Sequence, residues 1–300
     1  MSTFHLHPSL PPISPICLGG STFGREIPQD ACFALMDGAV ERGITLIDTA
    51  AMYGAGVSEK IVGAWLASRR PAPGSLNIAT KIYPPFTAAA IDSAVAGCAQ
   101  RLGVETIDLL YFHKWDAGAE TAEALRALDG LVRSGRVRAL GVSNFTAAQL
   151  RFVLTVQAQL GLTPFRALQN VNNLAVHEVD AALTALCAAH GVAIITYSPI
   201  GAGYLTGKHR GGVAPGSRFD VAPGHQPIYF KPGPERRLAK LAAVAERTGK
   251  TMAHLALAWA MHRPGVTSVL VGGRTPVHLD QAFTALAHND PALFAELEAD

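Results

Sequence analysis

Short apolar runs alternate with longer amphipathic stretches along the chain. The amphipathic stretches are rich in Ala, space their apolar residues as a helix does, and several end at Gly; examples are residues 30–43, 59–69, 90–103 and 122–135. The apolar runs, rich in Val, Ile and Leu, are ISPICLG (13–19), ITLIDTA (44–50), LNIATKI (76–82), IDLLYFH (107–113), VRALGVS (137–143), RALQNVN (166–172), VAIITYS (192–198) and VTSVLVG (266–272). This alternation is typical of βαβ repeats, and eight of them predict a (β/α)₈ TIM barrel of the α/β class.

No Pro/Ser-rich linker divides the chain, so residues 1–300 are expected to form a single domain. One long irregular stretch, about 199–234, follows the seventh apolar run and contains Phe219, His225, Tyr229 and Phe230 among many Gly and Pro residues. A connection of this length is usually a lid or a binding loop, and the alternative is a plain surface excursion.

Composition narrows the classes of protein and of partner. The 300 residues are 49% hydrophobic and carry a net charge of +2 without a long Lys/Arg block, so nucleic acid is not an expected partner. The N-terminus lacks a signal-peptide pattern and no apolar run reaches the roughly 18 residues of a membrane span. The cysteines, Cys17, Cys32, Cys98 and Cys187, lack metal-binding spacing. We therefore expect a soluble, cytoplasmic protein with no membrane partner and no metal; nothing in the sequence predicts an oligomeric state.

Four polar side chains lie at or just after the ends of successive predicted strands: Asp48, Tyr53, Lys81 and His113. In a parallel barrel these ends form one rim, where the chemistry of such folds is located. A phenol with a pKa of about 10 needs a positive neighbour to ionise near pH 7, and Lys81 provides that charge while Asp48 keeps it protonated. His113 can orient a carbonyl oxygen or assist proton transfer.

Each of these residues also has a structural interpretation when taken alone. Asp48 is suited to a cap or turn, Lys81 to a solvated strand end, Tyr53 to packing and His113 to a structural role. Their occurrence together at consecutive strand ends favours the catalytic interpretation.

The motifs DTAAMYG (48–54), ATK (79–81), YFH (111–113), GVSNF (141–145) and YSPIGAGYLTGK (197–208) resemble the aldo-keto reductase superfamily in order and spacing. The resemblance covers nearly the whole chain. It implies a barrel that binds a nicotinamide cofactor without a Rossmann domain. It also implies that Tyr53 is the general acid, that Lys81 and Asp48 lower its pKa, and that His113 orients the substrate.

The resemblance also implies a nicotinamide site. Ser143, Asn144 and Gln169 would hold the carboxamide, and Tyr197 would stack on the ring. Taken alone, Ser143 and Asn144 are also suited to cap the next helix, Gln169 to satisfy barrel backbone groups, and Tyr197 to ordinary packing.

Further cofactor contacts are expected from two segments. The first supplies small residues and amides for a pyrophosphate, with two cations: Ser198, Pro199, Ile200, Gly201, Gly203, Leu205, Lys208 and Arg218. The second opens a helix whose N-terminus suits the adenosine 2′-phosphate: Gly272, Gly273, Arg274, His278 and Gln281. Two residues depart from the family pattern, Asn172 where an aromatic residue is frequent and Ala282 where an asparagine is frequent. NADP(H) is the favoured cofactor, with NAD possible.

The substrate mouth is expected to be lined by Phe23, Met52, Tyr83, Lys114 and Trp115, and to be open because the chain ends in a helix soon after residue 288. The leading hypothesis is an NADP(H)-dependent oxidoreductase that reduces an aldehyde, ketone or sugar carbonyl. One alternative is an NAD-dependent sugar or alcohol dehydrogenase. Another is a cofactor-binding sensor or regulatory subunit with little turnover, similar to the reductase-like partners of potassium channels.

Overall fold

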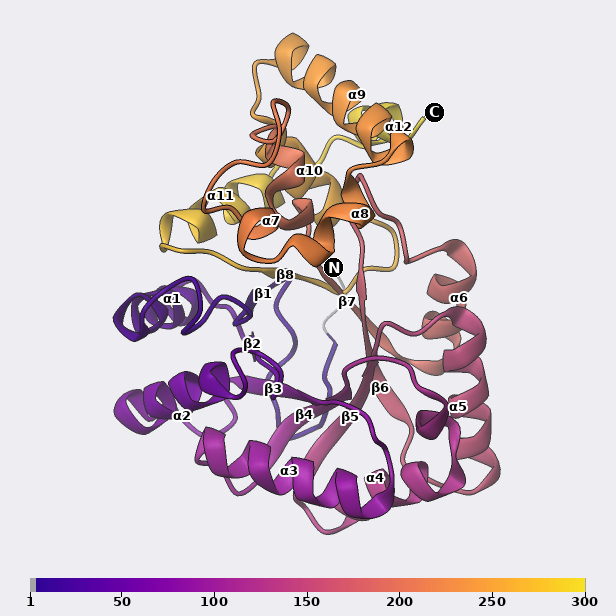
Figure 1. Cartoon of the computed structure of the whole chain (residues 1–300). Coiled ribbons are helices and arrows are strands. Elements are labelled where there is room, and N and C mark those ends of the chain that lie inside the picture. The colour runs from indigo at the N-terminus through magenta and orange to yellow at the C-terminus, as the bar shows by residue number, and fades with distance from the viewer. Residues whose placement is uncertain (1–3, 300) are drawn as a thin grey trace.

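The computed structural model, which describes residues 4–299, confirms the predicted (β/α)₈ barrel. Its strands are all parallel, and each pairs with its neighbours in the chain, with β8 closing on β1 (Figure 1). The strands are β1 (Ile16–Gly19), β2 (Leu46–Asp48), β3 (Asn77–Ile82), β4 (Ile107–Phe112), β5 (Val137–Ser143), β6 (Phe165–Val171), β7 (Ala193–Tyr197) and β8 (Ser268–Val271). Every predicted apolar run contains one of them or overlaps it almost completely.

Helices follow the strands around the outside of the barrel. The first six are α1 (Gln29–Glu41), α2 (Val57–Arg69), α3 (Ala88–Leu102), α4 (Ala122–Arg133), α5 (Ala147–Gln159) and α6 (Ala181–His190), with the short η1 (Ala117–Glu120) before α4. Thr146 caps α5 with a capping box, and Gly103 ends α3 with a positive φ.

The sequence suggested that the stretch after β7 is irregular throughout, but the structure shows otherwise. It folds into short helical turns, η2 (Gly201–Thr206), α7 (Arg218–Val221), η3 (Pro223–His225) and α8 (Gln226–Tyr229). The chain then forms α9 (Pro232–Thr248), α10 (Met252–Met261), α11 (Val277–Leu286) and α12 (Pro291–Glu298). Helices α9, α11 and η2 pack against α10, and this group lies at one side of the barrel (Figure 1).

The two-residue period of the strands separates the barrel interior from the layer beneath the helices. In β2, Leu46 belongs to the interior cluster and Ile47 to the outer one, so Asp48 points inward again. In β3, Ala79 is interior, which places Lys81 on the same inner face. The strand pattern therefore directs both charged side chains into the barrel.

Gly141 of β5 makes room for an aromatic side chain within the barrel. A Cβ at this position would lie 2.5 Å from the ring of Tyr111, which is completely buried. Tyr111 therefore fills the interior beneath Lys81, whose Nζ lies 5.8 Å from the centre of the Tyr111 ring.

No helix in residues 4–299 is long and apolar enough to cross a membrane. No group of three or more His, Cys, Asp or Glu residues in this range is placed to hold a metal ion. The four cysteines are buried and form no disulfides.

Candidate active site

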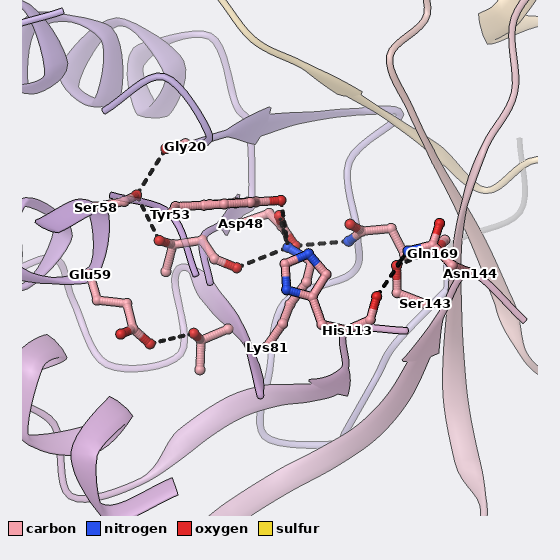
Figure 2. Close-up of polar contacts among 12 residues, drawn as sticks. Gly20, Asp48, Tyr53, Ser58, Glu59, Lys81, His113, Ser143, Asn144 and Gln169 are labelled. Atoms are coloured by element: carbon pink, nitrogen blue, oxygen red, sulfur yellow. Dashed lines mark hydrogen bonds and ion pairs between the residues drawn. The ribbon is translucent and has the colours of Figure 1, made fainter. Parts of the chain in front are cut away.

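The four rim residues predicted to act together converge at the carboxyl ends of β2, β3 and β4 (Figure 2). Lys81 Nζ donates to Asp48 Oδ1, to the carbonyl oxygen of Thr49 at 2.9 Å and to Tyr53 Oη at 3.4 Å. The rings of Tyr53 and His113 meet edge to face, with centroids 5.6 Å apart. The ammonium group thus joins the carboxylate to the phenol, and the imidazole lies beside the phenol.

The loop that carries Tyr53 is fixed by buried hydroxyl groups. Ser58 Oγ donates to the carbonyl oxygen of Gly20 at 2.9 Å and lies 2.7 Å from Thr49 Oγ1, and the Ser58 amide donates to the Tyr53 carbonyl oxygen at 3.2 Å (Figure 2). Ser58 and Thr49 are completely buried. This arrangement ties the start of α2 to β1 and β2 and limits movement of the phenol away from Lys81.

Lys81 and Asp48 form a buried ion pair whose charges are satisfied by neighbouring groups. Burial alone would lower the pKa of Lys81, but the Asp48 carboxylate, with a smaller contribution from Tyr53, raises it above its ordinary value. Asp48 also accepts a hydrogen bond from Gln169 Nε2 at 2.8 Å. Lys81 therefore remains an ammonium ion at neutral pH.

For Tyr53 the structure corrects the expectation that Asp48 helps to lower its pKa. Burial raises the pKa of Tyr53 most strongly; Lys81 opposes this shift, whereas Asp48 reinforces it, and the pKa ends above its usual value. Asp48 lies close enough to counteract the ammonium group, an effect that sequence spacing does not reveal. Tyr53 is therefore a protonated phenol at neutral pH, which is the form that a general acid requires.

His113 is neutral at physiological pH. Burial, assisted by the charge of Lys81, lowers its pKa to about 3. Its Nδ1 is buried and hydrogen bonded to no residue of the described chain. A neutral imidazole keeps one N–H donor and adds no charge to the site.

A second group of polar residues lies at the ends of β5, β6 and β7. Ser143 Oγ donates to the carbonyl oxygen of Gln169 at 2.7 Å, Asn144 Nδ2 to that of His113 at 2.9 Å, and Tyr197 Oη to Asn144 Oδ1 at 2.7 Å. Because Thr146 is the residue that caps α5, the capping alternative for Ser143 and Asn144 is not what the structure shows. Gln169 contacts the Asp48 carboxylate through its side chain and so does more than satisfy backbone groups.

Asn170 and the Thr49–Ser58 pair are supporting residues that the sequence analysis missed. Asn170 Oδ1 accepts from the amides of Asn144 at 2.9 Å and Phe145 at 3.3 Å, and its Nδ2 donates to the Phe145 carbonyl oxygen at 2.8 Å. It thereby holds Asn144 at a φ of 60°, a left-handed conformation that asparagine tolerates. The only local signal was the position of Asn170 next to Gln169.

The segment expected to approach a pyrophosphate forms the tight turn η2. The amides of Gly201, Gly203 and Leu205 donate to carbonyl oxygens of Ser198 and Ile200 within this turn. A Cβ on Gly201 would lie 2.7 Å from the Tyr229 ring, so glycine here permits close packing of α8. These three amides are already engaged, and Leu205 is completely buried. Pro199 lies before this turn.

The predicted cationic contacts differ in their surroundings. Arg218 pairs with Glu26 of the β1–α1 loop at 2.5 Å, an ion pair that the sequence did not predict. Lys208 is exposed, and Arg274 is exposed with a long hydrogen bond of 3.4 Å to the Gly216 carbonyl oxygen. Neither cation lies within 4.0 Å of a carboxylate in residues 4–299.

The start of α11 is organised by a side chain. His278 Nδ1 lies 3.4 Å from the Arg274 amide and 3.3 Å from the Thr275 amide, after Gly272 and Gly273. Gln281 is exposed on the same helix, whereas Ala282 is buried. The His278 ring thus lies beside the amides that the sequence had suggested for an anion.

Four of the five predicted mouth residues are at least partly exposed. Met52, Tyr83 and Trp115 are exposed, and Lys114 is partly buried with its Nζ 4.7 Å from the centre of the Tyr83 ring. Phe23 is the exception and corrects the prediction. The β1–α1 loop folds back through a bridge between Phe23 and Ile27, which buries the phenyl ring completely in the core.

Comparison with known families agrees with this geometry. Residues 15–297 match the Aldo/keto reductase family model, so the match extends from before β1 to the last turn of α12. Members of this family are oxidoreductases that use a nicotinamide nucleotide to reduce carbonyl groups. A match over this length shows that the chain belongs to the aldo/keto reductase family.

Proposed function

We propose that the protein is an NADP(H)-dependent carbonyl reductase in which Tyr53 is the general acid. The observation that carries the proposal is the contact of Lys81 Nζ with both Asp48 and Tyr53 inside the barrel. A phenol, an ammonium group and a neutral imidazole at one rim can bind a carbonyl oxygen and transfer a proton to it. The substrate is an aldehyde, ketone or sugar carbonyl, and the product is the corresponding alcohol.

In this mechanism the Tyr53 hydroxyl donates its proton to the carbonyl oxygen as negative charge develops there. Lys81 stabilises the resulting phenolate, and Asp48 keeps the ammonium group protonated and directed toward the phenol. His113, neutral and adjacent to Tyr53, donates a second hydrogen bond that orients the carbonyl. The bound cofactor supplies the hydride that the carbonyl carbon receives.

The residues at the ends of β5 to β7 fit a nicotinamide. Tyr197 is partly exposed, and its hydroxyl is held by Asn144, so that the ring has a fixed orientation. The side-chain nitrogen of Gln169 donates to Asp48, so its side-chain oxygen is the atom that would accept from a carboxamide. Ser143, Asn144 and Gln169 would hold that carboxamide, and Tyr197 would pack against the ring.

Selection of NADP(H) over NAD(H) is assigned to Arg274. Its guanidinium is exposed after β8 and faces no carboxylate within ion-pair distance in the described chain, so it is available to bind a 2′-phosphate. Lys208 is a second free cation near η2 and would contact the pyrophosphate.

A cofactor titration tests this assignment, with aldehyde reduction as the second readout. We expect the protein to bind NADPH more tightly than NADH, and Arg274→Met to weaken NADPH binding about tenfold while leaving NADH binding unchanged. Lys250→Met, at an exposed lysine in the α9–α10 connection, is the matched control. Equal loss of both cofactors in Arg274→Met would contradict the assignment, and preferential oxidation of alcohols with NAD would favour a dehydrogenase.

A further inference from the structure

The centre of the candidate active site carries no net charge. The ammonium group of Lys81 is paired with Asp48, and both side chains are almost completely buried. Tyr53 and His113 are neutral in the free protein. Charge-based selection of substrates therefore depends on residues at the mouth.

Lys114, the residue after His113, places a cation at the predicted substrate mouth. Its Nζ lies over the Tyr83 ring at 4.7 Å from the centroid, and the Tyr83 ring meets the His113 ring edge-on at 6.0 Å. His113 in turn contacts Tyr53 at 5.6 Å. The Tyr83 ring thus contacts both the Lys114 ammonium group and the His113 imidazole, and the imidazole contacts the phenol.

The acidic side chains that follow Lys114 most closely in the sequence are engaged elsewhere. Asp116 Oδ1 accepts from the Gly118 amide at 2.9 Å, and Glu120 Oε1 accepts from Trp115 Nε1 at 2.8 Å. No carboxylate of residues 4–299 lies within 4.0 Å of Lys114 Nζ. The ammonium group is partly buried over an aromatic face and so is open to a carboxylate from outside the chain.

A second cationic group near the mouth is less available. Arg25 is 2.7 Å from Glu26, and Glu26 is shared with Arg218 at 2.5 Å. Both guanidinium groups thus have a carboxylate partner, whereas Lys114 has none in the described chain. Of these cations, Lys114 is the one that an incoming anion reaches without breaking an ion pair.

The remaining mouth residues are apolar or aromatic. Met52 is 55% exposed, Tyr83 41% and Trp115 37%, so these side chains offer apolar and aromatic surface to a ligand. Apolar side chains with one cation beside them match a substrate that has an apolar or aromatic body and an acidic end.

On the basis of the proposed function, we propose that Lys114 is a specificity residue that binds a carboxylate on the substrate. The substrate class is then an aldehyde or ketone whose carbonyl group is separated from a carboxylate by an apolar spacer about the size of a benzene ring. The carbonyl lies at Tyr53 and His113, the spacer against Tyr83, and the carboxylate at Lys114 Nζ.

Two aldehydes of the same shape test this inference. 4-Formylbenzoate carries the carboxylate, and methyl 4-formylbenzoate replaces it with a neutral ester. For each variant, kcat/KM for the acid is divided by kcat/KM for the ester. The change in this quotient relative to the wild type does not depend on the different intrinsic reactivity of the two aldehydes. We expect Lys114→Met to lower kcat/KM for 4-formylbenzoate at least about fivefold through KM, with no change for the ester. Lys114→Glu is expected to lower it further, and added salt to reduce the effect in the wild type.

Control variants separate this cation from others. Lys250→Met removes an exposed lysine of the α9–α10 connection and is expected to leave both aldehydes unaffected. Arg25→Met tests the competing cation; if it abolished the preference for the acid while Lys114→Met preserved it, the inference would be overturned. Equal effects of Lys114→Met on both aldehydes would also overturn it. Turnover of the ester by the wild type tests the proposed function independently, so a failure of the substrate class is distinguishable from a failure of the reductase activity.

Discussion

The side-chain nitrogen of Gln169 donates to the Asp48 carboxylate across 2.8 Å, although the two residues are 121 positions apart. The same carboxylate receives Lys81 on its other oxygen. The residue expected to hold the nicotinamide is thus bonded directly to the residue that keeps Lys81 charged. The proposed cofactor site and the proposed proton-transfer site are therefore one hydrogen-bonded unit.

This link predicts a double effect of Gln169→Met. Loss of the donor leaves one oxygen of a buried carboxylate without its partner, which is expected to lower the free energy of unfolding by about 1–3 kcal/mol. Loss of the amide is also expected to weaken NADPH binding, because the carboxamide loses its acceptor. Urea unfolding and cofactor titration measure the two effects.

Gln157→Met is the matched control for this experiment. Gln157 is also completely buried and bonds the Thr163 carbonyl oxygen and the Phe165 amide, far from the rim. It should lose stability similarly but keep its affinity for NADPH. If both variants bound NADPH with wild-type affinity, Gln169 would have no role in the cofactor site.

Removal of Lys81 is expected to destabilise the protein strongly. Lys81→Met leaves Asp48 charged and buried without its counter-ion, which costs about 3–5 kcal/mol. The double variant Asp48→Asn/Lys81→Met removes the isolated charge and should recover most of this loss without recovering activity. Denaturant midpoints at constant m-value measure the loss of stability in each variant. If the double variant were as unstable as Lys81→Met, lost packing and not the unpaired charge would be the cause.

The pH profile of reduction follows from the two perturbed groups at the reacting centre. Tyr53 must be protonated to act as an acid, and burial raises its pKa above its ordinary value, so activity is lost only as pH rises through that raised value. His113, with its pKa lowered to about 3, stays neutral throughout the assay range. We therefore expect kcat/KM for a neutral aldehyde to be flat from about pH 6 to 9. An acidic limb near the ordinary histidine value that disappears in His113→Gln would contradict this assignment.

Much of the fold follows from local sequence patterns. The strands of a parallel barrel are buried on both faces, so they appear as continuous apolar runs, and β5 begins and ends where its run does. The inward direction of Asp48 and Lys81 follows from the alternation of side chains along β2 and β3. These features depend only on neighbours in the chain.

The features that the sequence did not reveal depend on contacts between distant segments. Arg218 forms an ion pair with Glu26, which is 192 positions away in the sequence. Phe23 is buried because its loop folds back on itself. The raised pKa of Tyr53 results from the balance of burial against Lys81 and Asp48, which is decided by how deeply the rim packs. The depth of burial at the rim cannot be predicted from composition and residue spacing.

The most direct test of the central claim is a single-turnover measurement of NADPH oxidation by Tyr53→Phe with a saturating aldehyde. This substitution removes only the hydroxyl group and keeps the ring beside His113, and unchanged NADPH binding would confirm that the site is intact. We expect a rate about 10²–10⁴-fold below that of the wild type. A variant that oxidised NADPH at the wild-type rate would show that the proton comes from another group.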